Sequence, residues 1–469
     1  MNALAEKENA RTLAAAIGIA EEQAAELLNV SAVVTYDVED SFASDCAKHV
    51  VALLGRTLRN VHTNTNLPNC PVAVEVVIGA VVPCSKSPHV FVHAIDEEFA
   101  VSSQPVAKSC GKIHPVGILL GACYATAAAL KVALGDLLPF HVPSLIHLRL
   151  GDLLGPDLPL MYKPVAFDEA YLAGAGAIGN GFIYGLGQFD ASGELHIADD
   201  DKVGDGNLQR CHFFEDRHLN RPKAEILSAA ASMILPNLKA TAHNVRIQDL
   251  PARHSGPWLK RLVVGVDSPR ARRSLQSELP GEVFDASTTG ISEVVLHFHR
   301  QPTVGACLGC VYPYNQQENA HEVHVAEALG VSLAEVHQAR ISPSTAKTIC
   351  RRYPSLIPSQ LVGTAYDTLF KQLCSTAALK KSEDRQVLAP FAFVSVLAGT
   401  LLAIEFVRRI QRGHDGLFNE WRVSPWSNPV LRRRRTLEKN SLCEFCSNPI
   451  FDGVIHEMWQ QNNLTTVVC

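Results

Sequence analysis

A glycine-rich loop is the first part of this chain whose residue types could do chemistry. The run GAGAIGN contains Gly174, Gly176 and Gly179. We expect a strand to end at Ala173 and a helix to begin near Gly181, so that backbone amides at the start of the helix face an anion. Taken alone, this spacing predicts only a nucleotide or dinucleotide site, because NAD and FAD sites use the same loop.

Two acids follow the loop at a distance that suits a nucleotide. Asp199 and Asp201 come directly after the next apolar run, Leu195 to Ala198. An acid about 20 residues beyond the glycines commonly binds the ribose hydroxyls. We therefore expect these two carboxylates to hold the ribose.

The residues after the acids point to phosphate rather than to hydride chemistry. Asn207 and Arg210 lie in NLQR, and Lys223 ends the run RPK. Asp267 follows an apolar strand and is placed to hold Mg²⁺ against a triphosphate, with Arg272 farther along the next segment. A nicotinamide-dependent oxidoreductase would leave NLQR without a role.

In order and type, these motifs resemble the superfamily of ubiquitin-activating enzymes and of the sulfur-carrier adenylyltransferases of thiamine and molybdenum-cofactor synthesis. The resemblance implies an α/β fold with a Rossmann-like adenylation domain and a mixed sheet. It also implies catalytic roles for Arg210 and Lys223. In that superfamily, ATP and Mg²⁺ are bound by the residues that correspond here to Gly174, Gly176, Gly179, Asp199, Asp201, Asn207, Arg210, Lys223 and Asp267, the last of which would hold the magnesium.

The chain departs from the family pattern at two points. Cys211 stands where a glutamine often follows NLQR, so this thiol is not assumed to be catalytic. Asp267 lies in GVDSP rather than in the more common D-x-x-D-N.

Two CxxC pairs predict a closed structural zinc site. The chain has 13 cysteines, an odd number without secreted-domain spacing, which favours reduced thiols. Two pairs of thiolates complete a tetrahedral site and leave no coordination position for chemistry. The family resemblance implies that such a metal ties the adenylation sheet to the C-terminal tail through Cys307, Cys310, Cys443 and Cys446.

A helical segment lies between the CxxC pairs, where thioester-forming relatives keep their catalytic cysteine. Two cysteines compete for that role, and the family position favours Cys374 over Cys350. Nearby cations lower a thiol pKa, but both cysteines have basic neighbours, so local charge does not separate them. The third alternative is that neither cysteine is catalytic and both are buried helix residues.

Residues 1–155 lack the glycine loop and the paired acids, yet their order of apolar and amphipathic segments resembles half of the same fold. The apolar helix expected in HPVGILLGACYATAAALKVALG resembles the later APFAFVSVLAGTLLAIEFV. We interpret 1–155 as a degenerate adenylation-like half, with an unrelated α/β domain as the alternative. The expected domains are then 1–155; 156–317, the ATP-binding part; 318–384, the helical catalytic-cysteine insertion; and 385–469, the remainder with the second thiol pair.

Composition is that of an ordinary globular protein, with 47% hydrophobic and 19% charged residues. A net charge of -5 gives no sign of a nucleic-acid binder. The apolar run from Val387 to Ile404 reaches the lower edge for a membrane span, but Pro390 and Gly399 interrupt it, so a buried helix is expected. We therefore expect a cytoplasmic protein with no nucleic-acid or membrane partner.

The resemblance as a whole implies an activating enzyme for a ubiquitin-like protein, similar to those of bacterial ubiquitin-like conjugation operons associated with antiphage defence. ATP would adenylate the C-terminal glycine of the modifier, a cysteine would form a thioester, and a conjugating enzyme would receive the modifier. Two alternatives stay open: a sulfur-carrier adenylyltransferase without a thioester step, and a scaffold that binds a ubiquitin-like protein without turnover. A homodimer is a further expectation, since relatives pair two adenylation folds.

Overall fold

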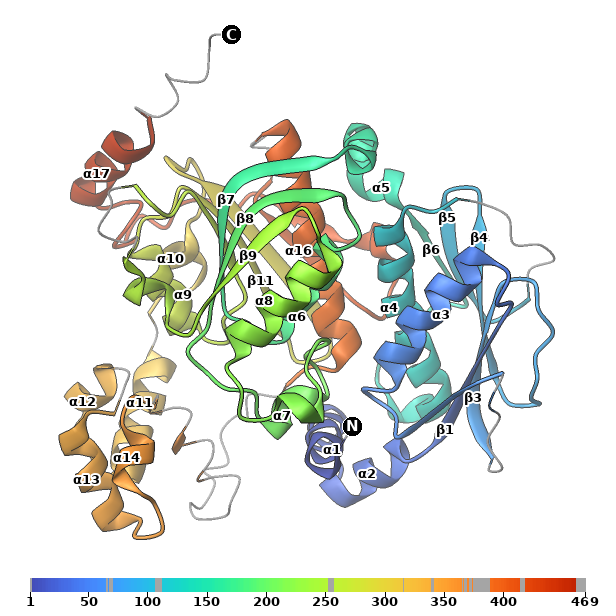
Figure 1. The fold of residues 1–469 in the computed structure, drawn as a ribbon, viewed down its shortest axis with the longest axis horizontal. Helices are drawn as coiled ribbons and strands as arrows, with labels where there is room; N and C mark the ends of the chain where they lie inside the picture. The colour runs from blue at the N-terminus through green and yellow to red at the C-terminus, as the bar shows by residue number, and fades with distance from the viewer. Residues whose placement is uncertain are drawn as a thin grey trace. The chain divides into compact units, whose positions relative to one another are not determined.

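The computed structural model of the chain describes residues 2–64, 66, 71–105, 112–251, 257–314, 316–338, 341–364, 366, 369–370, 373, 389–413 and 418–460. The chain divides into two compact units. The larger consists of Met1–Tyr312 with Leu388–Cys469, and the smaller of Pro313–Val387. The larger unit holds two α/β halves and the smaller one is helical (Figure 1).

The second α/β half is built on an eight-stranded sheet in the order β14-β13-β12-β11-β10-β7-β8-β9. Strands β7 to β11 run parallel, and β12 to β14 add antiparallel pairs at one edge. This mixed, Rossmann-like sheet confirms the predicted fold class. The bounds are β7 Val165–Ala173, β8 Ala191–Ala198, β9 Leu238–His243, β10 Arg261–Val264, β11 Glu282–Thr289, β12 Glu293–Arg300, β13 Glu420–Val423 and β14 Arg433–Arg435.

Helices cover both faces of this sheet. One face packs against α6 (Ala177–Leu186), α8 (Lys223–Ile234) and α16 (Ala392–Arg412), whose apolar side chains form the main core. The opposite face is covered by a loop that carries Trp258 and by α9 (Pro269–Gln276) and α10 (Leu308–Val311). The helix α17 (Pro449–Gln460) closes the described part of the chain and buries Trp459 against Leu279.

Glycines allow α6 and α16 to pack backbone against backbone. A Cβ atom on Gly399 would lie 2.2 Å from the carbonyl carbon of Gly181, and one on Gly185 would lie 2.7 Å from the Cα of Thr400. The side chains of α16 from Ala392 to Arg409 are buried. The late apolar run is therefore a core helix over its described residues, as its proline and glycine predicted.

The N-terminal half contains a six-stranded sheet in the order β2-β1-β3-β4-β5-β6. Strands β1 to β4 are parallel, and β5 and β6 are antiparallel. The bounds are β1 Ser31–Tyr36, β2 Asn60–Thr63, β3 Val72–Ile78, β4 His89–Ile95, β5 Glu98–Ser102 and β6 Leu145–Arg149, with helices α1 Ala3–Ile17, α2 Glu21–Leu28, α3 Ser41–Leu54, α4 Pro115–Leu134 and α5 Leu150–Leu154.

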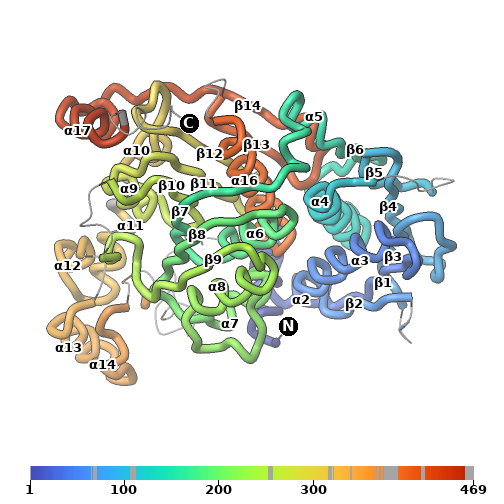
Figure 2. Tube along the Cα trace, turned by 45° about the horizontal axis from the view of Figure 1, so that its top comes forward, coloured from blue at the N-terminus to red at the C-terminus, as the bar shows by residue number. Residues whose placement is uncertain are grey.

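The two halves repeat one topology. The series β1, α3, β2, β3, β4, β5, α4, β6 matches β7, α6, β8, β10, β11, β12, α16, β13 in chain order, in sheet order and in strand direction. The long helices α4 and α16 lie side by side between the two sheets (Figure 2). A single core runs through both halves, from Ala5 to Trp426. This duplication agrees with the expectation of a degenerate adenylation-like half.

In the N-terminal half, a carboxylate occupies the place of the glycine loop. The turn between β1 and α3 reads DVED, and the side chain of Asp40 accepts a hydrogen bond of 3.2 Å from the backbone N–H of Ala43. An amide that would face a phosphate in the other half is thus capped by the chain's own acid.

Among the described residues, one helical stretch, Pro115–Leu137, is long and apolar enough to cross a membrane. Within its most apolar window, 83% of the residues are buried inside the protein. A buried core helix passes the same test, so this finding is weak evidence for a span.

The smaller unit contains four described helices, α11 Gln316–Leu329, α12 Leu333–His337, α13 Pro343–Arg352 and α14 Pro358–Leu361. Ser332 and Ser342 cap the second and third, each accepting a hydrogen bond of 3.2 Å from a backbone N–H three residues later. These helices share a core of their own that includes Val325, Leu329 and Ile349. The smaller unit is therefore helical, and the catalytic role expected for residues 318–384 stays a prediction.

Candidate active site

The glycine loop connects β7 to α6 at the point where three parallel strands end. The N–H of Gly174 donates to the carbonyl of Ala198 at 2.9 Å, and the N–H of Gly265 donates to that of Ala173 at 2.8 Å. Gly174 has φ +96, and a Cβ there would lie 3.0 Å from the backbone of Gly265. The ends of β7, β8 and β10 therefore converge on a turn that admits only glycine.

The third glycine of the motif is equally constrained. A Cβ on Gly179 would lie 2.2 Å from the carbonyl oxygen of Gly174, whereas Gly176 has ordinary space and serves as the N-cap of α6. The helix begins at Ala177, four residues before the expected Gly181. Because the helix starts inside the motif, its first amides lie directly behind the loop, which is the arrangement an anion site needs.

Asp199 anchors the loop. One of its carboxylate oxygens accepts from the N–H of Ala175 at 2.7 Å, and the other accepts from the N–H of Asp201 at 2.9 Å. Burial raises the pKa of Asp199 above its ordinary value. The first predicted acid thus orders the glycine loop itself, and Asp201 projects at the more exposed side.

Lys223 pairs with the second of these acids. It is the first residue of α8, it is 9% exposed, and its Nζ lies 2.9 Å from Oδ2 of Asp201. Burial acts to lower the pKa of Lys223, but the carboxylates of Asp199 and Asp201 outweigh burial and raise that pKa above its ordinary value. The ammonium is therefore charged and held beside the loop.

The NLQR motif forms a short arm that begins with α7 (Asp205–Leu208). The side-chain oxygen of Asn207 accepts a 2.9 Å hydrogen bond from the N–H of Gly204, so this residue shapes the turn. Arg210 follows the helix and is half-buried. Within the described part of the chain, its guanidinium makes no hydrogen bond or ion pair, which leaves its donors available for a ligand.

Cys211 lies in the interior of the site. The residue is fully buried, and burial raises the pKa of its thiol. The positive charges of Arg210, Lys223 and Arg56 act to lower this pKa, but burial outweighs them. A protonated, buried thiol is a poor nucleophile, in agreement with the expectation that this thiol is not catalytic.

Asp267 lies on the exposed side of the site, three residues after β10. The two residues before it, Gly265 and Val266, are the ones that touch Gly174. The following helix α9 is fixed by Arg272, which donates to Oδ1 of Asp285 at 2.8 Å in a buried ion pair. The structure therefore brings the loop, the two acids, Lys223 and the Asp267 turn to one edge of the sheet.

One site residue received no role in the sequence analysis. Asn180 is fully buried, and its side-chain nitrogen donates to the carbonyls of Ala175 and Gly176 at 2.9 Å. Its oxygen accepts from the N–H of Phe213 at 3.0 Å. This amide ties the glycine loop to the NLQR arm, and its only signal in the sequence is an asparagine inside an apolar helix.

The four paired cysteines form one cluster. The sulfur of Cys307 lies 3.9 Å from that of Cys310 and 3.6 Å from that of Cys443, and Cys310 lies 3.3 Å from Cys446. All four sulfurs are within 4.8 Å of one another. Zinc–sulfur bonds of about 2.3 Å in a tetrahedron place sulfurs about 3.8 Å apart, so the cluster fits a zinc ion.

The surroundings of the cluster also suit a metal. The N–H of Asn440 donates to the sulfur of Cys310 at 3.3 Å, as an amide does to a charged thiolate ligand. A Cβ on Gly309 would lie 2.5 Å from the ring of Phe445 and 3.2 Å from the sulfur of Cys443. The two loops are thus closely packed around the thiols, and the C-terminal one is joined to the sheet as expected.

The two candidate nucleophiles belong to the smaller unit. Cys374 lies outside the described residues. Cys350 is half-buried on α13, beside Arg351 and Arg352.

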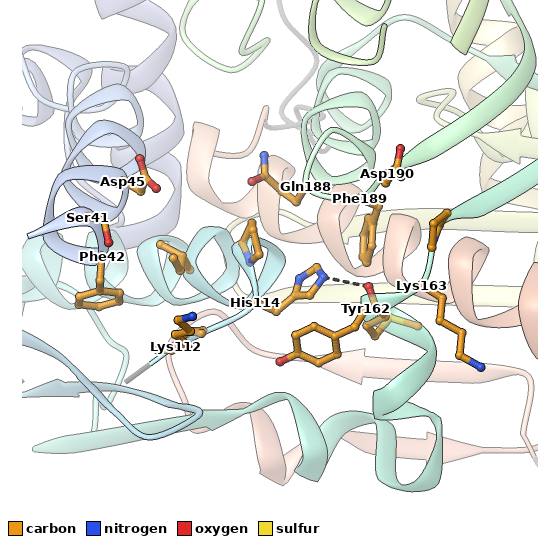
Figure 3. A pocket seen from close by; sticks show the side chains of 15 residues that line it. Ser41, Phe42, Asp45, Lys112, His114, Tyr162, Lys163, Gln188, Phe189 and Asp190 are labelled. Atoms are coloured by element: carbon orange, nitrogen blue, oxygen red, sulfur yellow. Dashed lines mark hydrogen bonds between the residues drawn. The ribbon is translucent and has the colours of Figure 1, made fainter. Parts of the chain in front are cut away.

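A pocket of about 490 Å³ lies between the two α/β halves, away from the glycine loop (Figure 3). It is lined by Gln188 and Asp190, which follow the opposite end of α6. His114 points into this region, but one ring nitrogen contacts the carbonyl of Met161 at 2.9 Å and the other accepts from the N–H of Val116 at 3.1 Å. Both ring nitrogens of His114 are thus already engaged within the protein.

Comparison with known proteins agrees with this geometry. A model of the ThiF family matches residues 165–445, and a model of the E1 N-terminal domain matches residues 1–146. Uncharacterized protein y4jF of Sinorhizobium fredii is 28% identical over 267 residues, which are 52% of this chain and 49% of that protein. Ubiquitin-like modifier-activating enzyme 7 of Mus musculus is 40% identical over 82 residues, 16% of this chain and 8% of that enzyme.

The chain thus spans about half of the first relative and a small part of the second. Among solved structures, that of E. coli MccB with ATP matches at 13% identity and a TM-score of 0.38, covering 76% of this chain and 98% of that one. The complex of E. coli MccB with MccA-N7isoASN matches at 14% identity and a TM-score of 0.39, covering 76% and 97%. Because the ThiF family model matches more than half of the sequence, the chain belongs to the ThiF family.

Proposed function

We propose that this chain is an adenylyltransferase that uses ATP to activate the C-terminal glycine of a ubiquitin-like protein. The observation that carries the proposal is the series of contacts that joins the glycine loop to Asp199, Asp201 and Lys223. It supplies two carboxylates for a ribose and a charged ammonium for phosphates at the same strand ends. Membership of the ThiF family and the match to an E1 N-terminal domain support this chemistry.

In the proposed first step, the terminal carboxylate of the modifier attacks the α-phosphorus of ATP. A new oxygen–phosphorus bond forms, the bond from the α-phosphorus to the bridging oxygen breaks, and pyrophosphate leaves. A carboxylate is already ionised at neutral pH, so no general base is required. Arg210 and Lys223 would neutralise the charge that builds up on the phosphates, and the first amides of α6 would bind phosphate oxygens.

Asp267 would hold a magnesium ion, which when bound supplies further positive charge against the triphosphate. Its exposed position at the end of β10 suits a hard, oxygen-binding cation. The four-cysteine cluster would hold zinc in a purely structural role, because four protein sulfurs leave no open coordination position.

In the proposed second step, a cysteine thiolate attacks the acyl carbon of the adenylate and AMP leaves. A thioester between the modifier and the enzyme results, and a conjugating enzyme then accepts the modifier through its own thiol. Family position assigns this role to Cys374, with Cys350 as the alternative. An enzyme that stops at the adenylate would instead act on a sulfur carrier.

Pyrophosphate exchange tests the first step. Radiolabelled pyrophosphate should enter ATP when the full chain is mixed with a ubiquitin-like protein that ends in glycine, and not when that terminal glycine has been deleted. Such exchange without any ubiquitin-like protein, or no exchange with any of a set of ubiquitin-like proteins that end in glycine, would contradict the proposal.

A non-reducing gel tests the second step. After incubation with ATP and the modifier, a higher-mass band that disappears on adding thiol should form with wild-type protein and with Cys350→Ala, but not with Cys374→Ala. The reverse pattern would assign the nucleophile to Cys350. Pyrophosphate exchange without any reducible band would favour the sulfur-carrier function.

A further inference from the structure

A side chain from the degenerate N-terminal half holds the arm that carries Asn207 and Arg210. Arg56 lies two residues after the end of α3, and its guanidinium reaches across to the second half. There it donates hydrogen bonds to three backbone carbonyls of one turn, those of Leu208, His212 and Phe214.

The geometry of this contact suits an arginine. Three carbonyl oxygens of one short loop point to a single centre, where they would repel one another without a shared donor. Both terminal nitrogens of Arg56 take part, and each also reaches the carbonyl of Phe214 at 3.3 Å. A planar fork of donors can serve three acceptors at once, whereas a lysine offers a single nitrogen.

Arg56 is itself held in place from the N-terminus. The side chain of Asn9 is buried and donates to the carbonyls of Arg56 and Thr57 at 2.6 and 3.4 Å. Asn9 belongs to α1, which lies next to α7 in the larger unit (Figure 1). The arginine therefore extends from a fixed backbone.

Other contacts from the N-terminal half reach the same arm. Asn2 donates to the carboxylates of Asp205 and Asp216 at 2.8 and 2.9 Å, at the two ends of the segment. His49 of α3 hydrogen-bonds to Tyr184, whose ring stacks on His212 at 3.7 Å between centroids. From its own half, the arm is held by the side chain of Asn180, whose oxygen accepts from the N–H of Phe213 as described above.

We propose that Arg56 is a positioning residue of the ATP site, which acts by fixing the NLQR arm so that Arg210 and Asn207 face the phosphates. The inference rests on the proposed ATP-dependent function. It gives the degenerate N-terminal half a role in the site. That half has no glycine loop of its own, but it would order the NLQR arm of the second half, which has one.

The variants Arg56→Gln, Arg56→Lys and Arg59→Gln test this role in the full chain. Arg59 is a matched control, because it lies in the same segment but is exposed, and its guanidinium pairs with Glu6 at 3.6 Å. Calorimetric titration with Mg·ATP gives both a dissociation constant and a number of sites. A variant that only unfolds in part binds fewer equivalents at an unchanged dissociation constant, so the two readouts separate positioning from folding.

We expect Arg56→Gln to weaken ATP binding by about tenfold or more, the factor given by about 1.4 kcal/mol, with about one site retained. Arg56→Lys should recover part of this loss, and Arg59→Gln should bind as wild type does. In protein without nucleotide, backbone amides of residues 205–214 should exchange hydrogen faster in Arg56→Gln than in wild type.

The possible failures are distinguishable. If wild-type protein binds ATP and Arg56→Gln binds it equally well, or binds fewer equivalents at an unchanged dissociation constant, only the role of Arg56 is wrong. If wild-type protein binds no ATP, the proposed function fails and this inference fails with it.

Discussion

The Lys223 ammonium lies 2.9 Å from the carboxylate of Asp201, in an ion pair that joins the start of α8 to the loop after β8. Both charges lie beside the glycine loop, since Asp199 binds Asp201 on one side and Ala175 on the other. The protein thus holds a nearly buried cation at a nucleotide loop, and carboxylates raise its pKa. A cation fixed in this way suits the phosphate-binding role proposed for Lys223.

Replacing Lys223 by methionine should reduce pyrophosphate exchange at least about 100-fold, because loss of one preorganised charge at a transition state commonly costs that much. Lys202→Met is the matched control, since Lys202 belongs to the same loop but is exposed. It should retain exchange within about twofold of wild type. Equal rates for the two variants would contradict the role given to Lys223.

Stability should fall in mild acid because of two buried histidines near the NLQR arm. Burial lowers the pKa of His49 to about 4 and that of His212 to about 3. In the unfolded chain both groups have a pKa near 6.5, so only the unfolded state takes up their protons as the pH falls from about 6.5 toward 4. Each histidine then removes about 1.4 kcal/mol of stability per pH unit.

Urea unfolding of His212→Phe at several pH values measures this effect. Phenylalanine keeps a ring against Tyr184 but cannot titrate, so the stability difference between pH 6 and pH 5 should shrink by about 1.4 kcal/mol. The control His141→Gln changes an exposed histidine and should follow the wild-type curve. A wild-type slope in His212→Phe would show that His212 is not the titrating group.

Replacing one glycine by alanine should have opposite effects on the free energy of unfolding in two different helices. Gly399→Ala places a methyl group 2.2 Å from the backbone of Gly181, so α6 and α16 must separate, and we expect a loss of about 1–3 kcal/mol in the free energy of unfolding. Gly453 lies in α17, and a methyl group added there would have nothing within 4 Å of it. Gly453→Ala should therefore gain about 1 kcal/mol from helix propensity. Chemical denaturation of both variants checks the pair, and a neutral Gly399→Ala would contradict the close approach.

About one zinc ion per chain should stay bound to the thiol cluster during purification. Elemental analysis should find this metal in wild-type protein and in Cys84→Ser, whose cysteine is exposed and outside the cluster. Cys307→Ser should lose it and melt at a lower temperature, because three thiols and a hydroxyl bind zinc less well than four thiolates. Wild-type protein that is fully folded and free of metal would contradict the assignment.

Local patterns were sufficient to predict the parts of the site that follow strand ends. The glycine loop and Asp199 come directly after parallel strands, and Asp267 lies three residues after another. Parallel strands bring their carboxyl ends to one edge. The thiol cluster was also predictable, because two CxxC pairs can share one ion wherever the chain folds them together. The buried helix α16 was marked by its glycine, which only a close helix contact explains.

Features that depend on distant pairing could not be predicted in this way. Arg56 and the carbonyl of Leu208 are separated by 152 residues, and an arginine at the end of an amphipathic helix is usually a solvated charge. Asn180 gave no signal beyond its residue type, although it bridges the loop and the arm. The start of α6 at Ala177 was missed because glycines inside the motif looked like loop residues, whereas Gly176 is the helix cap.

The central claim is that the glycine loop, with Asp199, Asp201 and Lys223, is an ATP site. Calorimetric titration of the purified chain tests this claim without any partner protein. Wild-type protein should bind Mg·ATP at about one site per chain and show no heat with NAD or NADH, and Lys223→Met should lose ATP binding. Binding of NAD without binding of ATP, or ATP binding that Lys223→Met leaves unchanged, would contradict the account.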